Sequence, residues 1–225
     1  MPSQQPWTDI AQRACIIVPV GSFEQHGPHL PLDTDTQIAL YLSESLSAHQ
    51  TQVVVAPAIA ITASGEHAGF PGTISIGTEA LSTVFVELVR SCDWALGVIF
   101  VHGHGGNLEA THIASQALQH ENRNFAHWWP RIVQADAHAG CTETSMMLAI
   151  NPGAVRIDRL SVGNIQPISE IQSELRNHGV KSVSPNGVLG DARLASAEIG
   201  KEIMHTLVSD LRDFVNTTRT RWQSS

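Results

Sequence analysis

The chain has few positive charges and no long apolar segment, and these absences exclude several classes of protein. Its 225 residues include 13 Lys and Arg against 21 Asp and Glu, which gives a formal charge of −8. No run of basic residues occurs, so we expect no binding to nucleic acid. No apolar stretch approaches the roughly 20 residues that span a bilayer, so we expect no membrane contact.

The sequence also lacks the features of secretion and of cysteine chemistry. The segment from Met1 to Trp7 is polar, with no basic start followed by an apolar stretch, so a cytoplasmic protein without a signal peptide is predicted. Cys15, Cys92 and Cys141 form no CxxC pair and are expected to be free thiols. The 12 His residues nearly equal the 13 Lys and Arg, which points to metal or acid–base chemistry.

Several common catalytic motifs are absent. The chain contains neither an HExxH helix nor a GxSxG elbow. The glycine-rich turn at 102–107 lacks the Lys-Ser/Thr of a phosphate loop and the spacing of a dinucleotide fingerprint. Water activated by a metal is therefore favoured over a Ser or Cys nucleophile.

Short apolar runs alternate with helical periodicity along the chain. We predict strands at 14–20, 53–56, 73–76, 97–101 and 131–135, and helices at 34–48, 78–94, 108–121, 143–150 and 196–219. The stretch 165–191 has little periodicity, and no linker divides the chain, so one domain over 1–225 is expected. The alternation predicts a three-layer α/β/α fold with a mainly parallel central sheet. Ligands of such folds bind beyond the carboxyl ends of the strands.

The segment after the first predicted strand carries candidate metal ligands. Glu24 and His26 are two residues apart, so an extended chain projects both to one side. A carboxylate and an imidazole placed in this way suit a divalent ion. Asp35 stands at the start of a predicted helix, where it could bridge two ions, while Asp33 is interpreted as the helix cap or a supporting group. The alternative is that the aspartates only cap the helix and Glu24 is solvated.

The turn at 102–107 follows another predicted strand. Its His104 is surrounded by glycines, which leave an open approach to a ligand. The backbone N–H groups of Gly105 and Gly106 could face a carbonyl oxygen. A purely structural turn remains the alternative.

Two further segments carry polar residues without a decisive pattern. His138 could act as a general acid or base, and Glu143 stands at a helix start, where a carboxylate could simply complement the helix dipole. Ser64, Glu66 and His67 could line a substrate pocket, although a tight turn explains them almost as well.

Taken together, these segments resemble a known family. EQHGPHLPLDTD at 24–35, FPGT at 70–73, GHGGN at 103–107 and HAG at 138–140 with ETS at 143–145 are similar to the creatininase (creatinine amidohydrolase) family over 14–150. The form GEHAGFPGTISIGT at 65–78 is most like the branch of the mycofactocin system. The resemblance to this branch implies a peptidase that releases a C-terminal dipeptide of the Val-Tyr type from a modified precursor peptide in mycofactocin biosynthesis.

The resemblance implies two divalent ions, which could be zinc, iron or manganese, in each subunit of a homo-oligomer of six or more chains. Glu24 and His104 would hold one ion and His26 the other, with Asp35 between them. The substrate would be a peptide or a small amide. One ion would polarise the amide carbonyl, and His138 or Glu143 would pass a proton to the leaving amine.

One family ligand has no counterpart here. Creatininase has a glutamate two residues after the family histidine, and this chain has Gly106 there. We predict Glu143 as the fifth ligand, with Glu109 as the weaker choice. Trp128 and Trp129 do not clearly match the tryptophans of the creatinine pocket, which argues against creatinine as substrate. The alternatives are a cyclic-amide or formamide hydrolase and, more remotely, a non-enzymatic module that binds a metal or a nucleotide.

Overall fold

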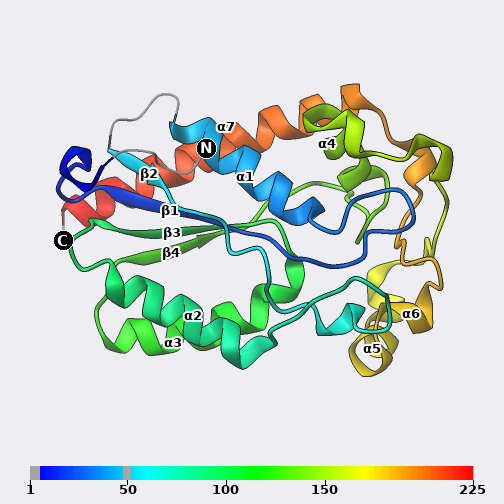
Figure 1. Ribbon diagram of the computed structural model, residues 1–225, viewed down its shortest axis with the longest axis horizontal. Helices are drawn as coiled ribbons and strands as arrows, with labels where there is room; N and C mark the ends of the chain where they lie inside the picture. The colour runs from blue at the N-terminus through cyan, green and yellow to red at the C-terminus, as the bar shows by residue number, and fades with distance from the viewer. Residues whose placement is uncertain (1–5, 48–51, 225) are drawn as a thin grey trace.

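Four parallel strands form the centre of the computed structural model, which describes residues 6–47 and 52–224 (Figure 1). The strand order is β2 (Val53–Val55), β1 (Cys15–Val20), β3 (Gly97–His102) and β4 (Phe125–Trp128). Each neighbouring pair is parallel. The prediction of a mainly parallel sheet is therefore confirmed.

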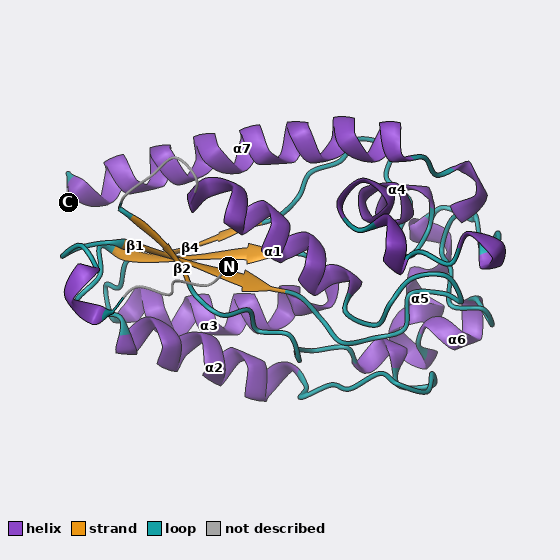
Figure 2. Ribbon diagram, turned by 45° about the horizontal axis from the view of Figure 1, so that its top comes forward, coloured by secondary structure: helices purple, strands orange, loops and turns teal. Residues whose placement is uncertain are grey.

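Helices cover both faces of this sheet (Figure 2). One face carries α1 (Thr34–Ser47), α4 (Cys141–Ile150) and α7 (Ala197–Gln223), and the other carries α2 (Thr78–Ser91) and α3 (Leu108–His120). Strand β1 shows why the three layers form. Its Ile17 packs in the core on the α1 side, while Ile16 and Val18 pack in the core on the α2 side. Successive strand side chains point to opposite faces, so a strand buried on both must be continuously apolar.

Two predicted strands are wrong. The predicted strand at 131–135 is irregular, with Val133 89% exposed and Gln134 at a φ of 59°. The fourth strand lies earlier, at β4. The segment at 73–76 is also not a strand, because its N–H groups bond to two different partners. Ile74 donates to the Phe23 carbonyl and Ile76 to the Thr62 carbonyl.

The stretch 165–191 is more regular than its sequence indicates. It forms α5 (Ile168–His178) and α6 (Val180–Val183). These helices lie at the end of the molecule toward which the strands point (Figures 1 and 2). Two 3-10 turns lie near the same end, η2 (Gly65–His67) and η3 (Gly105–Asn107). The carboxyl edge of the sheet, where ligands were expected, is therefore enclosed by segments from distant parts of the chain.

The remaining boundaries differ little from the predicted ones. Helix α4 begins two residues early, at Cys141, and α7 continues to Gln223. The predicted helix end at Ala48 and the first five residues of the polar N-terminus lie outside the described residues. The other 3-10 turns are η1 (Trp7–Asp9), η4 (Pro152–Ala154), η5 (Ile157–Arg159) and η6 (Ala192–Leu194). None of the described helices is long and apolar enough to cross a membrane.

Candidate metal centre

Asp35, in the first turn of α1, lies between two histidines. Its Oδ1 is 3.0 Å from His26 Nε2, and its Oδ2 is 3.1 Å from His104 Nδ1. The Ser22 hydroxyl donates a hydrogen bond to Oδ2 at 2.8 Å. Burial acts to raise the pKa of Asp35, but His26 and His104 outweigh it and hold that pKa well below its usual range. Asp35 is thus a buried carboxylate that presents one oxygen to each of two neighbouring sites.

His26 is oriented as a metal-binding imidazole usually is. Its Nδ1 donates to the Glu24 backbone carbonyl at 3.1 Å, which leaves Nε2 facing Asp35 and, at 3.9 Å, Glu143 Oε2. Such a bond from the far nitrogen fixes the ring and its tautomer. Burial lowers the pKa of His26, but the carboxylates, Asp35 foremost, raise it to about 10. The carboxylates around the buried His26 ring therefore favour a positive charge next to it.

Glu24 provides the test of whether a cation fits here. The residue is fully buried, and neither of its carboxylate oxygens has a hydrogen-bond partner among the described residues. His67 Nε2 and His104 Nε2 each lie 3.2 Å from one of these oxygens, but without hydrogen-bonding geometry. Burying a carboxylate whose oxygens accept no hydrogen bond carries a desolvation cost, even with two histidines at ion-pair distance. A bound cation would remove this cost, so the residues present fit a metal.

Among the residues that the structure describes, donor atoms form four groups of three, in each of which all lie within 4.8 Å of one another. The groups are Glu24–Asp35–His104, His26–Asp35–Glu143, Glu24–His26–His138 and Glu24–Glu66–His67. The first two share Asp35, as a pair of ions bridged by one carboxylate requires. Histidine and carboxylate donors without thiolate suit zinc, iron or manganese.

The structure brings Glu143 into this cluster. Burial raises its pKa to about 7, and its Oε2 accepts a hydrogen bond from the Ala139 N–H at 2.6 Å. Glu109 lines the adjoining cleft but belongs to none of the four groups. Asp33 accepts a hydrogen bond from the Gln37 side chain and is likewise outside them.

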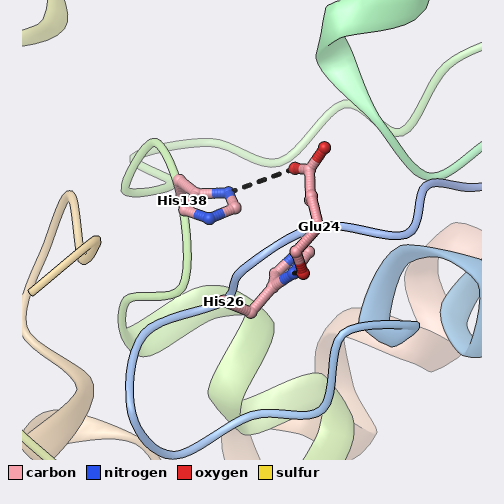
Figure 3. A group of neighbouring side chains, drawn as sticks. All are labelled: Glu24, His26 and His138. Atoms are coloured by element: carbon pink, nitrogen blue, oxygen red, sulfur yellow. Dashed lines mark hydrogen bonds and ion pairs between the residues drawn. The ribbon is translucent and has the colours of Figure 1, made fainter. Parts of the chain in front are cut away.

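His138 also lies against this cluster, with its ring facing the carboxylate of Glu24 (Figure 3). Its Nδ1 is 3.9 Å from Glu24 Oε1, and its ring centre is 4.4 Å from that of His26. Its Nε2 lies 2.8 Å from the Gln25 backbone carbonyl, to which it donates. Burial, with His26 and His67 nearby, holds the pKa of His138 well below its usual range. The ring is therefore neutral, with its free nitrogen facing Glu24.

Gln25 and His67 have larger parts in the site than the sequence indicates. The Gln25 side-chain amide lies 2.9 Å from His67 Nδ1 and donates to the Gly187 carbonyl at 3.0 Å. Its Oε1 accepts from the Gly27 N–H at 2.8 Å. His67 was predicted only to line the pocket, yet it is 3% exposed and faces Glu24. The sequence gives one hint about Gln25. It stands between the candidate ligands Glu24 and His26, so in an extended chain its side chain points away from theirs.

Gly106 stands against the cluster with no room for a side chain. A Cβ there would lie 2.3 Å from both Glu66 Oε1 and His104 Nε2, and 2.7 Å from the Ala63 carbonyl oxygen. Glu66 Oε1 is itself 3.4 Å from His104 Nε2. The carboxylate of Glu66 therefore occupies the space beside position 106.

A cleft of about 1410 Å³ opens beside these residues. Its lining includes Glu66, His67, Gly105 and Gly106 from the predicted substrate-binding set. Ser64, the fifth member, is fully buried and is not among the described residues that line the cleft. Helix α5 forms another part of the lining.

Comparison with known proteins agrees with this fold. Residues 3–215 match the family model described as Creatininase: Creatinine amidohydrolase. A mycofactocin precursor peptide peptidase of Mycolicibacterium smegmatis is 46% identical over 92% of this chain and 85% of its own. A crystal structure of creatinine amidohydrolase superimposes with a TM-score of 0.78 at 19% identity, covering 95% of each chain. A mutant creatininase described as a Zn–Zn type gives a TM-score of 0.74 at 21% identity, over 91% of this chain and 90% of that one.

The fold and the cluster are those of a metal-dependent amidohydrolase. The chain belongs to the creatininase family. It is accordingly a hydrolase that acts on amide bonds, which excludes the non-enzymatic alternative.

Proposed function

We propose that the chain is a two-metal peptidase that releases a C-terminal dipeptide from a modified precursor peptide in mycofactocin biosynthesis. The observation that carries this proposal is the position of Asp35, shared between two donor groups beside a large cleft. The 46% identity to a mycofactocin precursor peptide peptidase supports the choice of substrate.

The ligands follow from the two groups that share Asp35. Glu24 and His104 would hold one divalent ion, and His26 and Glu143 the other. When bound, such ions activate water toward an amide carbonyl and stabilise the charge that develops on its oxygen. Since Glu143 serves here as a ligand, the role of moving a proton falls to His138.

His138 is placed to move a proton between the cleft and the leaving amine. It lines the cleft, and its Nε2 bond to the Gln25 carbonyl keeps Nδ1 available as a proton acceptor. An imidazole held neutral can take up a proton in one step and return it in the next. The N–H groups of Gly105 and Gly106, at the cleft wall, would orient the substrate carbonyl.

The size of the cleft favours a peptide over a small amide. Its volume of about 1410 Å³ exceeds the roughly 300–1,000 Å³ typical of small-molecule sites. Several residues of an extended peptide fit such a space, whereas a cyclic amide would fill a small part of it. The cyclic-amide and formamide alternatives are therefore disfavoured.

An assay of three substrates tests the proposal. The purified protein, with zinc, iron or manganese added in turn, is incubated with a peptide ending in Val-Tyr, with creatinine and with a formamide. Mass spectrometry should detect release of the dipeptide and no turnover of the other two. Hydrolysis of creatinine or the formamide without peptide cleavage would refute the peptidase assignment.

The assembly and the location of the protein are part of the same proposal. We propose a cytoplasmic homo-oligomer of six or more chains, following the family resemblance. Sedimentation velocity should give a single species of at least six times the 24.3 kDa chain mass. A monomer at micromolar concentration would contradict it.

A further inference from the structure

The lining of the cleft carries groups of both charges. Around the metal centre it includes the carboxylates of Asp35, Glu66, Glu109 and Glu143. The part formed by α5 and α6 carries Arg176, His178 and Lys181 within one short stretch of chain. Figure 1 shows α5 and α6 at the end of the molecule beside the loop that contains η2. A substrate bound in the cleft can therefore meet basic groups as well as the metal centre.

Most of the basic groups that line the cleft are already engaged. Lys181 Nζ donates to the Gly69 carbonyl at 2.9 Å and lies 5.6 Å from the centre of the Phe70 ring. His178 Nδ1 lies 3.0 Å from Glu174 Oε1. His112, on α3, bonds to the side chain of Gln116 at 3.0 Å. Each of these groups therefore already has one partner within the protein.

Arg176 is different. No hydrogen bond or ion pair joins it to any other residue that the structure describes. An exposed arginine on an open surface needs no partner, but Arg176 lines the same cleft as the candidate metal ligands. A guanidinium binds a carboxylate through two parallel N–H donors, which fixes both the distance and the orientation of its partner.

Resting on the proposed peptidase function, we propose that Arg176 binds the C-terminal carboxylate of the peptide substrate. A dipeptide beyond the scissile bond extends roughly 7 Å at about 3.3–3.6 Å per residue. An anchor on α5 would hold the chain end at one distance from the metal centre and so select which amide bond is cut.

The test compares a peptide ending in a free Val-Tyr carboxylate with the same peptide ending in an amide. Wild-type protein should cleave the free acid about 10- to 100-fold more efficiently, as expected for a charge-assisted hydrogen bond. Arg176→Gln should lose this preference, mainly through a higher KM for the acid, with the amide unchanged. Arg176→Lys should retain part of it. Lys201→Gln, an exposed charge removed from α7, should behave as wild type.

Metal content and circular dichroism of Arg176→Gln should equal those of wild type, since the side chain has no structural partner. Equal losses on both peptides, or no loss on either, would overturn the role of Arg176 while leaving the peptidase function standing. If wild-type protein cleaves neither peptide, the peptidase function itself fails, and the proposal for Arg176 fails with it.

Discussion

Glu66 Oε1 lies 2.3 Å from the point where a Cβ on Gly106 would stand, so one carboxylate fills the space next to position 106. The same point is 2.3 Å from His104 Nε2 and 2.7 Å from the carbonyl oxygen of Ala63. The Glu66 side chain can rotate away, but the Ala63 backbone is fixed, so the new side chain cannot move toward it. A residue larger than glycine at position 106 must therefore displace the His104 side chain.

Gly106→Ala should weaken metal binding and lower kcat/KM about 10- to 100-fold, the range typical when the support of a ligand is disturbed. Gly105→Ala is the matched control, because a Cβ there meets nothing within 4 Å. Metal analysis of both variants, alongside the peptide assay, distinguishes them. The steric account is wrong if the two alanine variants bind the same amount of metal.

Gln25 should prove to be a positioning residue. Its side-chain amide reaches His67 and Gly187, and its backbone carbonyl accepts from His138. Gln25→Ala removes the side-chain bonds and leaves His67 Nδ1 without this partner in a buried site. We expect kcat to fall about 10- to 100-fold and the pH profile of kcat to shift. Gln25→Glu keeps the acceptor to the Gly27 N–H but cannot donate to the Gly187 carbonyl, so it should also lose activity. An unchanged pH profile would count against this role.

Acid should destabilise the fold through His127 on β4. Burial lowers the pKa of this ring to about 4, and its Nδ1 lies 3.0 Å from Nε2 of buried His102. In the unfolded chain a histidine titrates near 6.5. Below that pH the unfolded state binds a proton that the folded state does not, so stability falls as pH drops from about 6.5 toward 4.

Urea denaturation at pH 7 and pH 5 measures this effect. The loss of unfolding free energy between the two should be smaller in His127→Gln than in wild type, by about 1–2 kcal/mol. His205→Gln, on the exposed side of α7, is the control and should not change the loss. An equal loss in wild type and His127→Gln would show that His127 does not carry the acid sensitivity.

The sheet and its helices were largely predictable from the sequence, because strands buried on both faces read as unbroken apolar runs. Strands β1 and β3 are of this kind. Strand β4 was misplaced because its four residues include His127, whereas the β-branched pair Ile132 and Val133 lies in the irregular segment after it, where Val133 is 89% exposed. Helix α5 was missed although Ile168, Ile171 and Leu175 have helical spacing. Of these three residues only Ile171 is buried, so the apolar signal is weak.

Glu24, His26 and His104 could be placed together from the sequence because they follow β1 and β3 at the carboxyl edge of one sheet. Glu143 shows what this reasoning can predict and what it cannot. Its residue type and its helix start are local, but its approach to His26 depends on how α4 packs against the sheet. The roles of Gln25 and Arg176 depend likewise on contacts between segments far apart in the chain, which local patterns do not encode.

The central claim is that Asp35 joins two metal sites, and metal analysis of the purified protein tests it most directly. Wild-type protein should contain about two divalent ions per chain after dialysis, as a dinuclear site requires. Asp35→Asn should retain fewer than one and should not hydrolyse the peptide, whereas Asp33→Asn, the neighbouring control, should retain both ions. An Asp35→Asn protein that keeps two ions per chain, with a wild-type circular dichroism spectrum, would contradict the account.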